Sequence, residues 1–151
     1  MTQVFPMVSA PMRSLVLLGG IALLLVAVLA VLGYVAYSAT QARFEVSPDG
    51  LRIAGDFFGR TIPIEKLRLD EARVLDLGRE SNLRPRVRTF GTGLPGYRSG
   101  WFRLRDRQKA LLYVTDPARV VYIPTTEGYV LMLSAVQPDS MLAALRGARA
   151  G

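Results

Sequence analysis

Residues 101–133 read WFRLRDRQKALLYVTDPARVVYIPTTEGYVLML and carry the clearest structural pattern in the 151-residue chain. Apolar runs rich in β-branched and aromatic residues alternate with short polar stretches; the runs cover 101–104, 110–114, 120–123 and 129–133. Runs of four or five such residues between turn signals are typical of β-strands. The stretch therefore predicts four strands, and the polar residues 106–108 predict a hairpin between the first two.

The same density of turn signals extends upstream, where four further short strands are predicted at 43–46, 51–53, 62–64 and 74–77. Ser-Pro-Asp-Gly at 47–50 predicts the turn between the first two of them, because Gly50 is able to adopt a positive φ. Pro63 has no backbone N–H, so the third of these strands is expected at a sheet edge or at a bulge.

The pattern changes from strand to helix near the C-terminus. Pro138 is suited to the first position of a helix, and Met141, Leu142 and Leu145 share one helical face. Gly147 is expected to end this helix after about ten residues. A helix this short is marginal alone, so its apolar face is expected to pack on the open end of a β-barrel.

This order of seven or eight strands and one C-terminal helix resembles the pleckstrin-homology (PH) plan, which has about seven strands. The residues are similar to those of small bacterial PH-like domains found beside transmembrane helices, over about 44–146. The likeness is carried by 88–102 (RTFGTGLPGYRSGWF), by 113–116, by 121–125, and by Ser134, Pro138, Leu142 and Leu145. It implies that 40–148 form an open barrel that acts as a binding or assembly module, without catalytic residues.

A second region of the chain is strongly apolar. Residues 15–36, LVLLGGIALLLVAVLAVLGYVA, contain no charge, and as a helix they span about 33 Å, enough to cross a bilayer core of about 30 Å. We therefore predict a transmembrane helix at 15–37 after a short tail at 1–14. A cleavable signal peptide is the alternative, although this apolar core exceeds the usual 7–15 residues.

The charges that flank the span predict its orientation. The N-terminal tail contributes Arg13, whereas Arg43, Arg52 and Arg60 follow the span. The positive-inside rule therefore favours a cytoplasmic C-terminal domain in a single-pass protein of the cell (inner) membrane.

Histidine and cysteine are both absent from the sequence, which excludes several functional classes. Disulfides, thiol nucleophiles, Cys/His zinc sites and Ser-His-Asp triads cannot be built from this chain. We expect no enzyme activity, cofactor or metal. The alternative is an enzyme-accessory or periplasmic domain with a carboxylate-based activity at Asp70, Glu71 and Asp76, although surface ion pairs are the favoured interpretation of these residues.

The positive charge is concentrated in one segment. The chain has a net charge of +7, and residues 79–109 alone hold nine basic side chains against Glu80 and Asp106. Much of this segment, 78–100, contains many glycines and prolines and is predicted to be a long irregular loop. Loops of about twenty residues in a compact domain are commonly functional or disordered.

We expect this loop to form an anion site. Arg84, Arg86, Arg88 and Arg98 are predicted to converge on phosphate or carboxylate, assisted by the backbone amides of Gly91, Gly93 and Gly96. The predicted partners are the lipid bilayer and its anionic headgroups, a membrane-protein partner, or a second copy of the chain. The alternative is a solvated basic surface, some of whose arginines pair with Asp70, Glu71 and Asp76.

Two other interpretations of the segment are disfavoured. Residues 91–96 match G-x-G-x-x-G, but a dinucleotide fingerprint needs a preceding apolar strand and a following helix, which the sequence does not predict here. Interleaved arginines and aromatic residues also suggest single-stranded nucleic acid. A membrane anchor makes nucleic acid an unlikely partner.

Overall fold

The computed structural model describes residues 3–39 and 41–151, which fall into two compact units, one on each side of Thr40. The first unit contains helix α1 (Met12–Ala39), which begins before and ends after the predicted span 15–37. Its segment Met12–Tyr37 is long and apolar enough to cross a membrane. Thr40, predicted as the first residue of the domain, and the first two residues of the predicted tail lie outside the described residues.

The second unit opens with a three-stranded antiparallel sheet in the order β1-β2-β3. The strands are β1 (Arg43–Ser47), β2 (Gly50–Ala54) and β3 (Thr61–Pro63). Ser47 pairs with Gly50, so residues 48–49 form the predicted tight turn. Pro63 ends the edge strand β3, as predicted, and the 3-10 helix η1 (Ile64–Lys66) follows.

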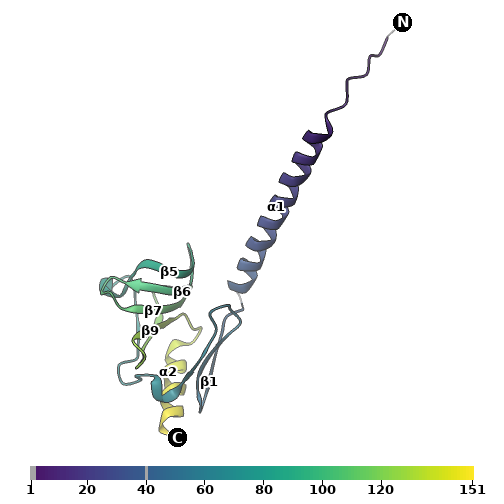
Figure 1. Cartoon of the computed structure of the whole chain (residues 1–151). Helices are drawn as coiled ribbons and strands as arrows, with labels where there is room; N and C mark the ends of the chain where they lie inside the picture. The colour runs from purple at the N-terminus through teal and green to yellow at the C-terminus, as the bar shows by residue number, and fades with distance from the viewer. Residues whose placement is uncertain (1–2, 40) are drawn as a thin grey trace. The chain divides into compact units, whose positions relative to one another are not determined.

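A six-stranded sheet follows in the order β4-β8-β9-β7-β6-β5. Its members are β4 (Arg73–Leu75), β5 (Pro85–Leu94), β6 (Tyr97–Leu104), β7 (Lys109–Val114), β8 (Val120–Pro124) and β9 (Tyr129–Leu133). Strands β7 and β9 pair in parallel, whereas the other neighbours are antiparallel. Figure 1 shows β5, β6, β7 and β9 side by side.

The prediction of an irregular loop at 78–100 was wrong. After the short 3-10 helix η2 (Ser81–Leu83), β5 and β6 form a long hairpin in which Leu94 pairs with Tyr97 across a two-residue turn. The described part of the chain therefore contains nine strands instead of the seven or eight predicted. Pro85 did not prevent a strand, because it begins an edge strand, where a missing N–H is tolerated.

Glycine 91 shows why glycines within this hairpin were mistaken for loop signals. Its φ is +147°, and an added Cβ would lie 2.2 Å from the carbonyl oxygen of Ser99 on the paired strand. A side chain therefore cannot be accommodated where the two backbones come so close. The glycine permits a close strand pairing instead of interrupting it.

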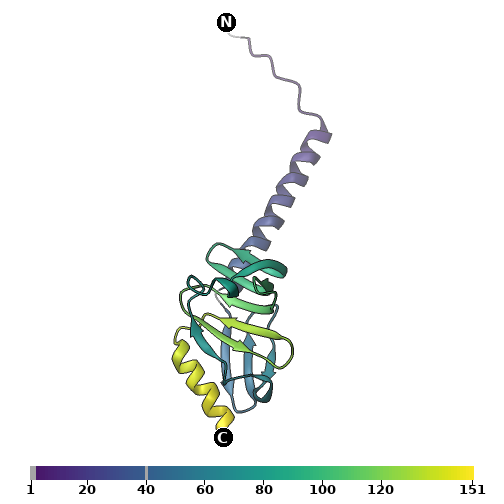
Figure 2. The ribbon, with the colours of Figure 1, turned by 90° about the vertical axis from the view of Figure 1, so that its left-hand side faces the viewer.

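The first apolar core lies where the two sheets and helix α2 (Pro138–Ala150) meet. The predicted face of α2, Met141, Leu142 and Leu145, is buried in this core, and Figure 2 shows the helix in yellow against the strands. The helix continues past Gly147, which differs from the prediction, and Arg146 Nη2 donates a hydrogen bond to the Ala72 carbonyl at 2.8 Å.

A second apolar core covers the other face of the six-stranded sheet. Side chains from β6, β7, β8 and β9 meet Leu75, Leu77 and Leu83, which lie in β4 and in the segment that follows it. Every residue of β8 and β9 is buried, and so is all of β7 except Lys109. The domain therefore has one core on each side of its central strands.

Truncation of Leu145 tests the packing of α2. Leu145 is completely buried, so Leu145→Ala is expected to lower the free energy of unfolding of the fragment 41–151 by about 2–5 kcal/mol in urea denaturation. The matched control is Val136→Ala, at a side chain that is 96% exposed, which is expected to change it by less than about 0.5 kcal/mol. Equal effects of the two substitutions would contradict the packing.

Candidate anion-binding site

Three of the four predicted arginines surround one open depression on the β5–β6 hairpin. Arg86 and Arg88 come from β5 and Arg98 from the start of β6, and Gly93 lies among them. The depression has a volume of about 640 Å³, and its lining also includes Pro85, Leu94, Pro95 and Phe102. Each of the three arginines is exposed.

The strand register brings these side chains together. Arg88 pairs with Phe102 and Gly93 pairs with Arg98, so residues distant in the sequence become neighbours across the ladder. The register shifts between Arg88 and Phe90, which marks an irregularity of the β-bulge type. Bulges re-aim side chains at sheet edges, and β5 is an edge strand.

The Gly93 backbone lies beside the side chains of Arg88 and Phe102. A Cβ added to Gly93 would lie 3.8 Å from Arg88 Nη1 and 3.8 Å from two ring atoms of Phe102. The guanidinium of Arg88, the Phe102 ring and the Gly93 backbone therefore lie close together. The other two predicted glycines have structural roles in the hairpin. Gly96 lies in its turn with a φ of +77°, and Gly91 permits the close pairing of its two strands.

The three arginines have no internal acidic partner among the residues that the structure describes: none of them forms an ion pair or a side-chain hydrogen bond there. The planar guanidinium group donates two N–H bonds at once to a carboxylate or a phosphate. The arrangement is therefore suited to an external anion.

The carboxylates proposed as alternative partners pair with arginines outside the depression, and one of these arginines, Arg79, belongs to the basic segment 79–109, as the alternative predicted in part. The ion pairs are Asp70–Arg149 at 3.5 Å, Glu71–Arg68, and Asp76–Arg79 at 3.9 Å. All three are exposed pairs, as the favoured interpretation of these acidic residues predicted. None of them contacts Arg86, Arg88 or Arg98 through an ion pair in the described residues.

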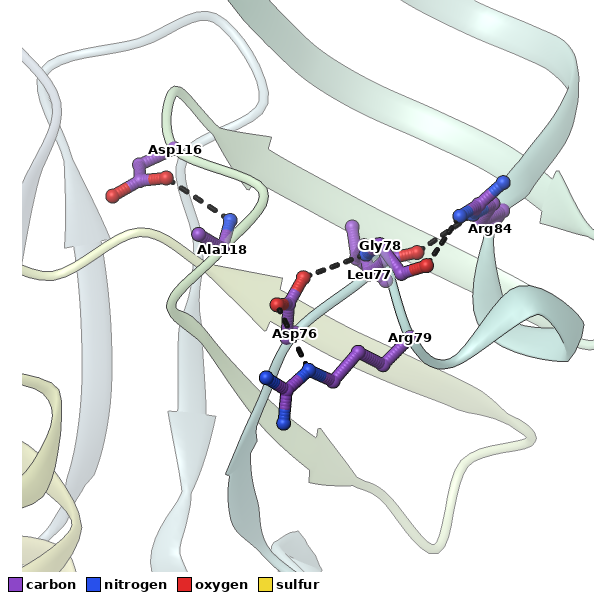
Figure 3. A network of polar contacts seen from close by, with 7 residues as sticks. All are labelled: Asp76, Leu77, Gly78, Arg79, Arg84, Asp116 and Ala118. Atoms are coloured by element: carbon purple, nitrogen blue, oxygen red, sulfur yellow. Dashed lines mark hydrogen bonds and ion pairs between the residues drawn. The ribbon is translucent and has the colours of Figure 1, made fainter.

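Arg84 does not join the other three arginines, in contrast to the prediction. Its Nε donates a hydrogen bond to the Leu77 carbonyl at 2.7 Å, and its Nη2 donates to the Gly78 carbonyl. Asp76 in turn accepts a bond from the Gly78 N–H at 2.7 Å (Figure 3). Arg84 therefore holds the segment that carries Leu77 over the second core.

A neighbouring pocket of about 520 Å³ shares Arg98 with the depression. Its lining includes Arg84, Arg105 and Asp76, and a turn in which Asp116 accepts a hydrogen bond from the Ala118 N–H at 3.0 Å (Figure 3). Arg105 was not selected from the sequence as a site residue. Because Asp76 places a negative charge in this pocket, the first depression is the better anion site.

Tyr97 also lines the neighbouring pocket and contributes no negative charge to it. Burial raises the pKa of Tyr97, although a hydrogen bond with Ser99 acts in the opposite direction. Its hydroxyl donates to Asp56 Oδ2 at 3.4 Å. The phenol therefore stays protonated at neutral pH, and the positive potential around Arg98 is not reduced by it.

The different roles of Arg84 and Arg86 are testable. Arg84→Met removes two hydrogen bonds to backbone carbonyls, so the fragment 41–151 is expected to lose about 1–3 kcal/mol of unfolding free energy. Amide hydrogen exchange over 76–84 is expected to become faster. Arg86→Met, the matched control, is expected to change stability by less than about 0.5 kcal/mol; the reverse order of effects would contradict these roles.

Comparison with known families agrees with this architecture. The family model of the bacterial PH domain matches residues 42–149. No curated protein and no solved structure matches the chain. The matched region contains both sheets, helix α2 and the candidate site. The chain therefore belongs to the bacterial PH domain family.

Proposed function

We propose that this chain is a single-pass protein of the cell (inner) membrane whose PH domain binds anionic lipid headgroups through Arg86, Arg88 and Arg98. The observation that carries the proposal is the set of three exposed arginines around Gly93, without an acidic partner in the described residues. PH-like domains are generally non-catalytic binding or assembly modules, which supports a binding role.

The expected strength of this interaction follows from its charge. A basic residue near an anionic membrane surface contributes about 1 kcal/mol, so three contribute about 3 kcal/mol. Every 1.4 kcal/mol corresponds to a tenfold change in affinity, so the three arginines account for about a hundredfold. The interaction is weak for a free protein and is expected to depend on salt.

An anchor in the same chain makes a weak interaction sufficient. Helix α1 is long and apolar enough to span the membrane, and Thr40 separates it from the PH domain. Binding by a tethered module occurs at an effective concentration of about a millimolar. The site would then orient the domain on the cytoplasmic leaflet, where anionic lipids are abundant, instead of recruiting it from solution.

The proposal is tested by charge reversal. The fragment 41–151 contains all the buried residues of both cores and is suited to vesicle co-sedimentation. Arg86→Glu, Arg88→Glu and Arg98→Glu together are expected to weaken binding to vesicles of anionic phospholipid by about a hundredfold or more. Vesicles of phosphatidylcholine are expected to bind both proteins weakly.

A matched control separates a site from general charge. Arg52, Arg68 and Arg119 are exposed arginines outside the hairpin, and their exchange for Glu changes the net charge by the same amount. This control is expected to retain most of the binding. Equal losses in the two triple variants would contradict a site, and unchanged binding after reversal of the hairpin arginines would reject lipid binding by them in favour of a protein partner or a second copy.

A further inference from the structure

Three phenylalanines form a patch at the surface of the PH domain, beside the first core. Phe57 and Phe58 lie between β2 and β3, and Phe90 lies in β5. The ring centroids of Phe57 and Phe58 are 5.4 Å apart, as are those of Phe58 and Phe90, with nearly perpendicular planes. Phe57 is 82% exposed and Phe90 is 61% exposed. We refer to these three residues as the phenylalanine patch.

The loop that carries Phe57 and Phe58 is well packed, although the rings of Phe57 and Phe90 are exposed. Phe58 is partly buried against the first core, and a Cβ added to Gly100 would lie 3.2 Å from its ring. The Asp56 carboxylate accepts hydrogen bonds from the Phe57 N–H at 2.7 Å and from the Tyr97 hydroxyl at 3.4 Å. The loop is therefore fixed to the β5–β6 hairpin, and its outer aromatic side chain has no cover.

The patch lies at the end of the domain where the polypeptide enters it. Gly55 packs so closely on the Gln41 backbone that an added Cβ would be 2.0 Å from the Gln41 carbonyl oxygen. Tyr37 is the last residue of the apolar segment, and Gln41 follows it by four residue steps, which span at most about 14 Å. The interfacial layer of a bilayer is about 5–8 Å thick on each side.

We propose that the phenylalanine patch inserts into the interfacial region of the bilayer that α1 spans. This inference rests on the membrane anchor of the proposed function, but it does not require anionic lipid. Aromatic and apolar side chains at the headgroup–acyl boundary gain free energy from burial, and nearby basic residues pair with headgroup phosphates. Arg43, which pairs with Ala54 next to the loop, is exposed and supplies such a charge.

The free edge of β5 brings the two membrane-binding features together. Arg88 pairs with Phe102 of the second core, whereas Phe90 pairs with Trp101, which packs on the first core. The patch and the basic depression therefore lie on opposite faces of the same edge strand. Val87 and Leu94 are also exposed on β5. A bilayer that meets this edge contacts apolar and basic side chains at once.

A second copy of the chain fits this edge less well than a bilayer does. A regular exposed edge would allow another strand to pair, but β5 has register shifts after Pro85 and after Arg88 that interrupt its ladder. Two copies paired along β5 would also bring Arg86 and Arg88 of each close to those of the other. Like charges in neighbouring strands are destabilising, so the edge is poorly suited to self-pairing.

The test uses the full chain in single-copy nanodiscs of phosphatidylcholine. Because the sequence contains no cysteine, Phe57→Cys gives a unique position for an environment-sensitive nitrobenzoxadiazole (NBD) label. The label at 57 is expected to show blue-shifted emission and strong quenching by a nitroxide-labelled lipid. The substitution leaves the cores intact, since Phe57 is exposed.

The control label is placed by Asp49→Cys in the turn at the other end of the β1–β2 hairpin. Five residue pairs separate this turn from the patch, a distance of about 17 Å along the strands. Quenching at 57 is expected to be several-fold stronger than at 49, and Phe90→Ser is expected to reduce it. Water-like emission at both positions, in discs that retain the chain, would overturn the proposal.

Three further results distinguish insertion of the patch from binding by the anion site and from self-association. Reversal of Arg86, Arg88 and Arg98 is expected to leave the signal at 57 largely unchanged in phosphatidylcholine, so failure of the anion site does not remove it. Chain that is not retained in the discs would reject the membrane anchor and the patch proposal together. A blue shift that appears only with two copies per disc, without quenching by the lipid nitroxide, would assign the patch to self-association and overturn membrane insertion.

Discussion

Burial of the central strands on both faces is the constraint on which the rest of this domain depends. Strands β8 and β9 are buried throughout, and β7 nearly so, which leaves no solvated face at the middle of the six-stranded sheet. Each large aliphatic side chain buried in this way contributes about 1.5–3 kcal/mol relative to exposure. Each face therefore needs a cover: the small sheet and α2 supply one, and the segment around Leu77 and Leu83 supplies the other.

The second cover determines which arginines are free for binding. The segment 76–84 contains little regular structure, so its backbone carbonyls need other partners, and Arg84 provides two hydrogen bonds to them. Arg86, Arg88 and Arg98 lie beyond this segment on an edge hairpin. Because the nearby carboxylates pair with other arginines, the positive charge of the hairpin remains available to an external anion. Arg84 therefore supports the cover of the second core, whereas Arg86, Arg88 and Arg98 carry the charge of the candidate site.

Much of this fold could be predicted from local pattern, and the remainder depended on long-range pairing. The tight turn at 48–49, the strands from 101 to 133 and the buried face of α2 follow from turn residues and periodicity. The uninterrupted apolar runs in the central strands indicate burial on both faces, whereas a strand buried on one face alternates apolar and polar residues. Strand β5 was missed because Pro85, Gly91 and Gly93 are loop signals whose meaning changes at a sheet edge.

The candidate site was also predictable only in part, because local sequence locates its charges but not the contacts that form on folding. Charge counting located the basic segment, and the structure brings three of its four selected arginines together at Gly93. The role of Arg84 could not be inferred, since it depends on carbonyls six and seven residues away that become accessible only after folding. The Phe57–Phe58 pair in a turn was a local signal for the phenylalanine patch, but its third member, Phe90, comes from a strand that the sequence did not predict.

The proposed role in lipid binding requires Arg86, Arg88 and Arg98 to act as one anion site. The most direct measurement is an NMR titration of the ¹⁵N-labelled fragment 41–151 with glycerol 1-phosphate, a soluble analogue of a phospholipid headgroup. We expect the amide and Nε signals of the three arginines and the Gly93 amide to shift together and to saturate with one dissociation constant. Shifts spread equally over Arg52, Arg68 and Arg119, or no saturable shift at the hairpin, would contradict it.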